Sequence, residues 1–241
     1  MVQKHTVKAF DDELKQLADI IARMGGVTES QLDEAIEALA QRDNARAEAV
    51  VLADARIDLL EHEVDEMAVR LIALRQPMAA DLRVIIAALK IAPIIERIGD
   101  YAKNIAKRSL AISRMAPVRP LFTVPRMGRM AREMIKDVLD AYAAGDIAAA
   151  RAVWERDHEL DEMYDSLFRE LLTYMIEDPR NISPCTHLLF VAKNIERIGD
   201  LATNISEIIH FQVEGRMIED DRPKVDEAST TVVSAPAGRG G

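Results

Sequence analysis

The sequence is poor in aromatic residues and in cysteine, and each shortage excludes a class of protein. Aromatic residues make up only 4% of the 241 residues, whereas Ala, Leu, Ile, Glu and Arg are abundant. This composition is typical of packed helices. Because Cys185 stands alone, a disulfide framework and a thiolate metal site are both excluded.

An excess of positive charge and a long uncharged apolar run are also missing. The formal net charge is −10, which argues against nucleic acid as a partner because phosphate contacts need clustered Lys and Arg. The most apolar stretch, residues 71–95, carries Asp81, Arg83 and Lys90, which is too much charge for a membrane span. The first residues lack the apolar segment of a signal peptide. We therefore expect a cytoplasmic protein.

Apolar residues recur at helical spacing over nearly the whole chain, and no stretch alternates as a strand would. The pattern predicts one long helix that continues through Gly25 and Gly26. A second helix is predicted over about 46–74, and a third over about 80–113 with a kink at Pro93. Three more helices are predicted near 126–143, 147–177 and 184–214. The expected fold class is all-α.

The two halves of the chain repeat each other, which is the sequence signature of a duplicated structural unit. At an offset of 103 residues, Met24-Gly25 aligns with Met127-Gly128. At an offset of 100, ERIGDYAKNI at 96–105 aligns with ERIGDLATNI at 196–205. Two tandem, pseudo-symmetric three-helix bundles are the simplest interpretation.

The predicted boundaries follow from this repeat and from composition. The first bundle is expected over residues 5–114 and the second over 126–215. Residues 115–125 contain several prolines and are predicted to be a linker. Residues 219–241 are acidic and then rich in small residues, which predicts a disordered tail.

Each half also carries two pairs of acidic residues at a spacing of four, which places both members of a pair on one helix face. In an antiparallel hairpin that turns near Pro77, Asp58 faces Glu96 and Asp54 faces Asp100. In the second half the turn falls at Asp178-Pro179, and the matching pairs again face each other. The candidate metal-ligating residues are Asp54, Asp58, Glu96, Asp100, Asp157, Asp161, Glu196 and Asp200.

Clustered carboxylates need a counter-charge, because like charges about 4 Å apart repel by roughly 1–4 kcal/mol in surface-like surroundings. A hard cation such as Mg²⁺, Mn²⁺ or iron suits carboxylate oxygens. Salt bridges from Arg97 and Arg197 are the structural alternative, and a solvated helix face is the simplest interpretation of any single pair. Gly99 and Gly199 in mid-helix indicate close approach of either a neighbouring helix or a ligand.

These motifs resemble the PhoU family of bacterial phosphate-transport accessory proteins. The likeness covers about residues 5–215 and depends on MGG at 24–26, RQPMAADLR at 75–83 and the duplicated ERIGD-x-A-x-N-I. It implies two three-helix bundles side by side, with Mg, Mn, Fe or Zn ions held by the eight carboxylates. The chain departs from the family pattern at Pro93, where a polar residue is more usual, so the second site is expected to follow the family more closely.

The resemblance also implies a function. Members damp phosphate uptake and the phosphate-starvation response by contacting the phosphate ABC transporter's ATPase subunit and the sensor histidine kinase. They are commonly homodimers in the cytoplasm, at the inner face of the membrane. A carboxylate-bridged metalloenzyme of hydrolase type is the alternative function, and a helical scaffold without metal is a third.

Overall fold

The computed structural model describes residues 2–118 and 123–216, with side chains from residue 9 onward. All regular structure in these ranges is helical, so the predicted all-α class is confirmed. The predicted tail at 219–241 lies outside the described residues. The helices are α1 (Val2–Gln41), α2 (Asn44–Ala53), α3 (Ala55–Arg75), α4 (Ala80–Ile112), α5 (Thr123–Ala144), α6 (Ile147–Glu177) and α7 (Ile182–Glu214), with a short 3-10 helix η2 (Pro179–Asn181) before α7.

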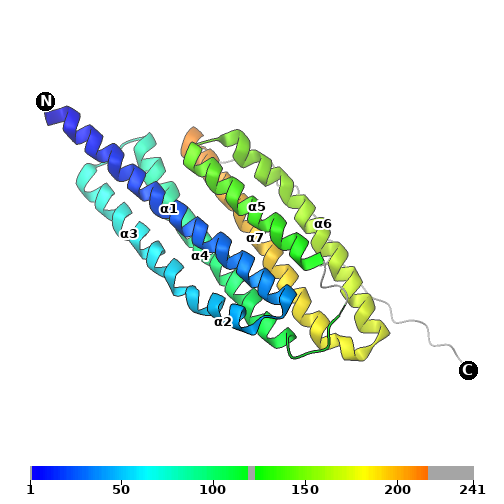
Figure 1. Ribbon diagram of the computed structural model, residues 1–241. Coiled ribbons are helices and arrows are strands. Elements are labelled where there is room, and N and C mark those ends of the chain that lie inside the picture. The colour runs from blue at the N-terminus through cyan, green and yellow to red at the C-terminus, as the bar shows by residue number, and fades with distance from the viewer. Residues whose placement is uncertain (1, 119–122, 217–241) are drawn as a thin grey trace, which may run out of the picture.

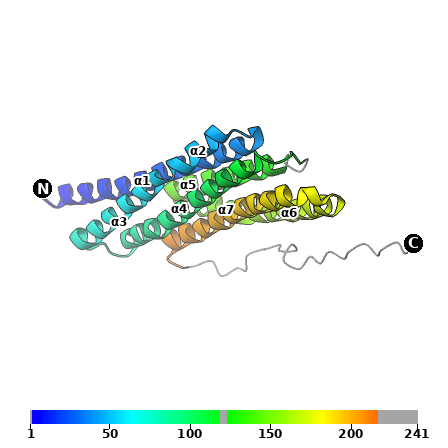
Figure 2. The same ribbon diagram turned by 90° about the horizontal axis from the view of Figure 1, so that it is seen from below.

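The helices form two bundles that lie side by side. The first contains α1, the segment α2–α3, and α4, and the second contains α5, α6 and α7. The bundles join where α4 packs against α7 and α1 packs against α5. Figure 2 shows the same helices from below, with their axes running along the long direction of the molecule. Within the described ranges, no helix is both long and apolar enough to span a bilayer.

One predicted helix is divided in the structure, and another contains a proline. The helix predicted over 46–74 divides at Asp54, because the Ile57 amide donates to the Asp54 carbonyl at 2.8 Å, three residues back. This bond tightens one turn and separates α2 from α3. Pro93 does not interrupt α4, which runs unbroken to Ile112. Packing of α4 against α1, α3 and α7 offsets the cost of the proline, about 3 kcal/mol in an isolated helix.

The turn before the second helix of each bundle shows the pseudo-symmetry. Arg42 and Gly145 occupy matching positions, and both have left-handed backbones, with φ of 55° and 64°. The next residue caps the helix in each case: the Asp43 carboxylate accepts from the Arg46 amide, and Asp146 caps α6 in the same way, both at 3.0 Å. The duplicated sequence therefore folds into duplicated local structure.

Glycine allows α1 and α5 to meet closely between the bundles. A Cβ at Gly25 would lie 2.2 Å from Leu139 Cδ1, and a Cβ at Gly128 would lie 2.7 Å from Ile36 Cγ1. Ile36 and Leu139 are themselves separated by the repeat offset of 103. The two contacts are therefore equivalent and are related by the pseudo-symmetry of the chain.

Enlarging Gly128 is expected to weaken this interface. Gly128→Val should lower the free energy of unfolding by about 1–3 kcal/mol, because the added atoms collide with Ile36 in a packed contact. Gly26→Ala is the matched control, since a Cβ there meets nothing within 4 Å. It should raise stability by about 0.5–1 kcal/mol through helix propensity alone. Urea unfolding measures both, and equal shifts would contradict the close contact.

Candidate functional site

The first carboxylate cluster, on α2–α3 and α4, is organised around a lysine. Lys103 Nζ donates to Asp54 and, at 2.5 Å, to Asp100 Oδ1. Burial alone would lower the pKa of Lys103, but the hydrogen bonds to Asp100 and Asp54 outweigh it and raise the pKa above its usual value. The structure thus brings Asp54 and Asp100 together, as the hairpin predicted, with an ammonium between them.

Glu96 lies in the same cluster and is surrounded by other acids. Burial raises the pKa of the Glu96 carboxyl, and the negative charges of Asp100 and Glu61 raise it further. Asp58 and Asp54 act in the same direction. The other three predicted residues of the first half therefore all act on Glu96. Glu61 is an addition that the four-residue spacing did not include, although it follows Asp58 by one helical turn.

The second cluster, between α6 and α7, is more deeply buried. The exposed fractions are 1% for Asp157, 2% for Asp161 and 4% for Glu196, and Asp165, which sequence analysis missed, is 3% exposed. Asp165 follows Asp161 at the same spacing of four, so extending the predicted stripe by one step would have found it. This half of the chain thus holds a group of carboxylates out of water, which is costly without compensation.

A different lysine serves the second cluster. Lys193 Nζ donates to Glu196 Oε1 at 2.9 Å. Burial alone would lower the pKa of Lys193, but the bond to Glu196 and the nearby Tyr164 and Asp200 raise it. Asp200, the fourth predicted residue of this half, is partly exposed at the edge of the cluster.

The glycines of the two ERIGD motifs let the helices of each hairpin approach. A Cβ at Gly199 would lie 2.6 Å from Leu160 Cδ2 and 2.7 Å from Asp157 Oδ1. A Cβ at Gly99 would lie 2.6 Å from Ile57 Cδ1. Of the two explanations left open by the sequence, the neighbouring helix is therefore present at both glycines. In the second half a carboxylate oxygen also occupies the space that a Cβ would fill.

The two lysines do not occupy matching positions. At the offset of 100, Lys103 aligns with Thr203, and Lys193 aligns with Pro93. Each cluster therefore has its own ammonium, supplied from opposite ends of the ERIGD motif. Both were missed in the sequence, although each lies three residues from an acid of the motif, where helical side chains can pair.

The arginines of the motifs do not neutralise the clusters. Arg197 lies over the ring of Tyr101, with its guanidinium carbon 5.9 Å from the ring centre. Within residues 2–118 and 123–216, neither Arg97 nor Arg197 forms an ion pair with a cluster carboxylate. Salt bridges to the clusters therefore exist, but Lys103 and Lys193 form them instead of Arg97 and Arg197.

The chemistry of the donors bears on which cation could be held. Carboxylate oxygens suit Mg²⁺, Mn²⁺ or iron better than Zn²⁺, which prefers nitrogen and sulfur ligands. As the side chains stand, no three His, Cys, Asp or Glu residues of the described ranges are close enough together to hold an ion. The second cluster suits a metal ion better than the first. In the first cluster the ammonium of Lys103 already lies between Asp54 and Asp100, whereas in the second cluster Lys193 bonds to one acid, Glu196.

The fold and the site define a class: an all-helical protein of two repeats, each with a carboxylate cluster between its last two helices. The PhoU domain model matches the chain twice, over residues 21–109 and 124–209. The two matches fall on the two bundles. The chain belongs to the PhoU family, and the resemblance drawn from its motifs is confirmed.

Relatives match along nearly the whole chain. A phosphate-specific transport system accessory protein PhoU homolog from Caulobacter vibrioides is 54% identical over 227 residues, covering 94% of this chain and 99% of the relative. The corresponding PhoU of Escherichia coli is 38% identical and covers 89% of each chain. The crystal structure of PhoU from Pseudomonas aeruginosa superposes with a TM-score of 0.82 at 37% identity, covering 86% of this chain and all of that one. The predicted fold of two tandem three-helix bundles is thereby confirmed.

The raised pKa of Glu96 predicts a pH dependence. The folded state binds this proton more tightly than the unfolded state does, so stability falls as the pH rises from the ordinary value of 4.5 toward the raised one. Glu96→Gln should therefore stabilise the metal-free protein at neutral pH, by about 0.5 kcal/mol or less because solvent screens this partly exposed side chain, and not below pH 4 or so. Thermal unfolding in chelator at several pH values tests this. Asp100→Asn, which removes an acceptor of Lys103, is expected to destabilise instead.

Proposed function

We propose that the chain is an accessory regulator of a phosphate-specific transport system. It lowers phosphate uptake and the phosphate-starvation response when phosphate is plentiful, by contacting the transporter's ATPase subunit and the sensor histidine kinase. It acts as a homodimer at the cytoplasmic face of the membrane and catalyses no reaction. The observation that carries this proposal is the match to PhoU relatives over 94% of the chain, at 54% identity.

The carboxylate clusters have separate roles in this proposal. The second cluster holds a hard metal ion, with Asp157, Asp161, Glu196 and Asp200 as the ligand set. Its buried carboxylates support this role, since a cation offsets their desolvation and mutual repulsion. Bound metal would fasten α6 to α7 and fix the surface that those helices present to a partner.

The first cluster supplies its own cation. Lys103 joins Asp54 on the α2–α3 segment to Asp100 on α4, which is the connection that a metal would make between those helices. We therefore assign the ammonium of Lys103 the structural role in the first half that metal has in the second. Asp58 and Glu96 remain candidates for a weaker site beside it.

Metal content and regulation are measured on the same pair of variants. Asp161→Asn with Glu196→Gln should lose most of the metal found by elemental analysis of gently purified protein. The matched pair Asp58→Asn with Glu96→Gln, at the equivalent positions of the first half, should retain it. Equal loss in both pairs, or no loss in either, would contradict the assignment to the second half.

A phosphate-starvation reporter provides the functional readout. In cells without this chain the reporter should stay active at high phosphate, and the wild-type chain should silence it. The double variant Asp161→Asn with Glu196→Gln should fail to silence the reporter, and the double variant Asp58→Asn with Glu96→Gln should silence it. If the wild-type chain itself had no effect on the reporter, the regulatory proposal would be wrong. If the double variant Asp161→Asn with Glu196→Gln lost metal but still silenced the reporter, only the proposal that metal takes part in regulation would be wrong.

A further inference from the structure

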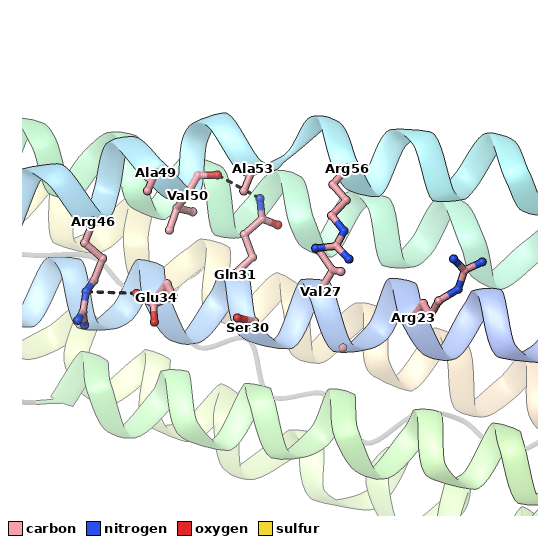
Figure 3. A pocket seen from close by; sticks show the side chains of 11 residues that line it. Arg23, Val27, Ser30, Gln31, Glu34, Arg46, Ala49, Val50, Ala53 and Arg56 are labelled. Carbon is pink, nitrogen blue, oxygen red and sulfur yellow. Dashed lines mark hydrogen bonds and ion pairs between the residues drawn. The ribbon is translucent and has the colours of Figure 1, made fainter.

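A hollow of about 690 Å³ lies away from both carboxylate clusters, between α1 and the α2–α3 segment. Its floor is apolar and made of small residues, among them Val27, Ala49, Val50 and Ala53 (Figure 3). The volume is within the range of pockets that hold drug-sized or cofactor-sized molecules. The chain thus has a cavity that the metal and partner proposals do not use.

Ion pairs close the hollow at its two ends. Arg46 on α2 pairs with Glu34 on α1 at 3.2 Å, and Arg23 on α1 pairs with Glu63 on α3 at 2.9 Å. Arg23 and Glu34 are 11 residues apart on α1, which corresponds to about 16 Å at the helical rise. A peptide running along the groove would have to break one of these pairs, whereas a small molecule fits between them.

An arginine without a partner points into the hollow. Arg56 extends from α3 toward Val27 on α1 (Figure 3), and it makes no hydrogen bond or ion pair with any described residue. Further along the groove, the amide of Gln31 is buried between the helices: Nε2 donates to the Val50 carbonyl at 3.3 Å, and Oε1 faces Gly99 of α4, 3.2 Å from where a Cβ would lie. Because Arg56 is exposed, its guanidinium is hydrated and can exchange that water for an anion held in the hollow.

The second repeat has a smaller version of this groove, a hollow of about 390 Å³. Ala53 aligns with Arg156, whose guanidinium crosses to Asp137 on α5 at 2.8 Å. Asp137 is the counterpart of Glu34. Arg56 aligns with Glu159, so the second groove also lacks the free positive charge. The first groove is therefore larger and more basic than the second because of particular residues that differ between the repeats.

We propose that this hollow binds a small organic phosphate that carries more than one negative charge and an apolar ring, the chemistry of a nucleoside diphosphate. The phosphates pair with Arg56, whose planar group matches phosphate oxygens bidentately, while the ion pairs of Arg23 and Arg46 stay closed at the two ends. The ring covers the floor of Val27, Val50 and Ala53. This site is independent of the metal and of the partners proposed above.

Calorimetric titration of the full chain with ADP tests the site, with adenosine and pyrophosphate as the two halves of the ligand. ADP should bind saturably, and each half should bind at least about tenfold more weakly. Arg56→Glu and Ala53→Arg introduce the second repeat's residues and should weaken ADP binding by about tenfold or more. Lys107→Glu, an exposed position outside the hollow that aligns with Glu207, is the matched charge-reversal control and should leave binding unchanged.

Several results would overturn the proposal. Absence of saturable ADP binding at millimolar concentration would do so, as would pyrophosphate binding as tightly as ADP, which would leave the apolar floor unused. Equal weakening by Lys107→Glu would show general attraction rather than a site. Circular dichroism of each variant confirms folding, and Ala53→Arg has a folded precedent in Arg156 of the same chain.

Discussion

Each carboxylate cluster depends on a glycine that lets one helix of a hairpin come close to the other. At Gly99 and Gly199 the side chains of Ile57 and Leu160 occupy the place of a Cβ. A glycine in mid-helix costs about 1 kcal/mol relative to alanine, and the close packing that it permits offsets that cost. Without this approach, the acids on the facing helices would stand in solvent, where neither a lysine nor a metal would be needed to hold them together.

Close packing brings a problem of charge, and the two halves solve it differently. In the first half, Lys103 reaches between the two helices and pairs with an acid on each. In the second half, Lys193 pairs with Glu196 of its own helix and reaches α6 through the ring of Tyr164, with Nζ 4.9 Å from the ring centre, rather than through an acid of that helix. The repeats share a backbone plan but have diverged in their chemistry. The same divergence distinguishes the larger, basic hollow beside α1 from the smaller one that Arg156 lines in the second repeat.

Much of this was visible in the sequence, because it depends on local pattern. Helical periodicity gave the fold class, and the repeat with its turn positions predicted that Asp54 would face Asp100 and that Asp58 would face Glu96. The lysines were missed because they break the repeat: Lys103 aligns with Thr203, and Lys193 with Pro93. Asp165 was missed because its counterpart, His62, is not an acid. The hollow could not be predicted, since it depends on the absence of side-chain volume at Gly26 and Ala53 once two helices are packed.

The central claim is that metal belongs to the second cluster and an ammonium to the first. Anomalous diffraction at the manganese edge, from crystals of the full chain grown with Mn²⁺, tests it directly. Anomalous density is expected between α6 and α7, beside Asp161 and Glu196, and none between Asp54 and Asp100. Density beside Lys103 with none in the second half, or no density in either half, would contradict it.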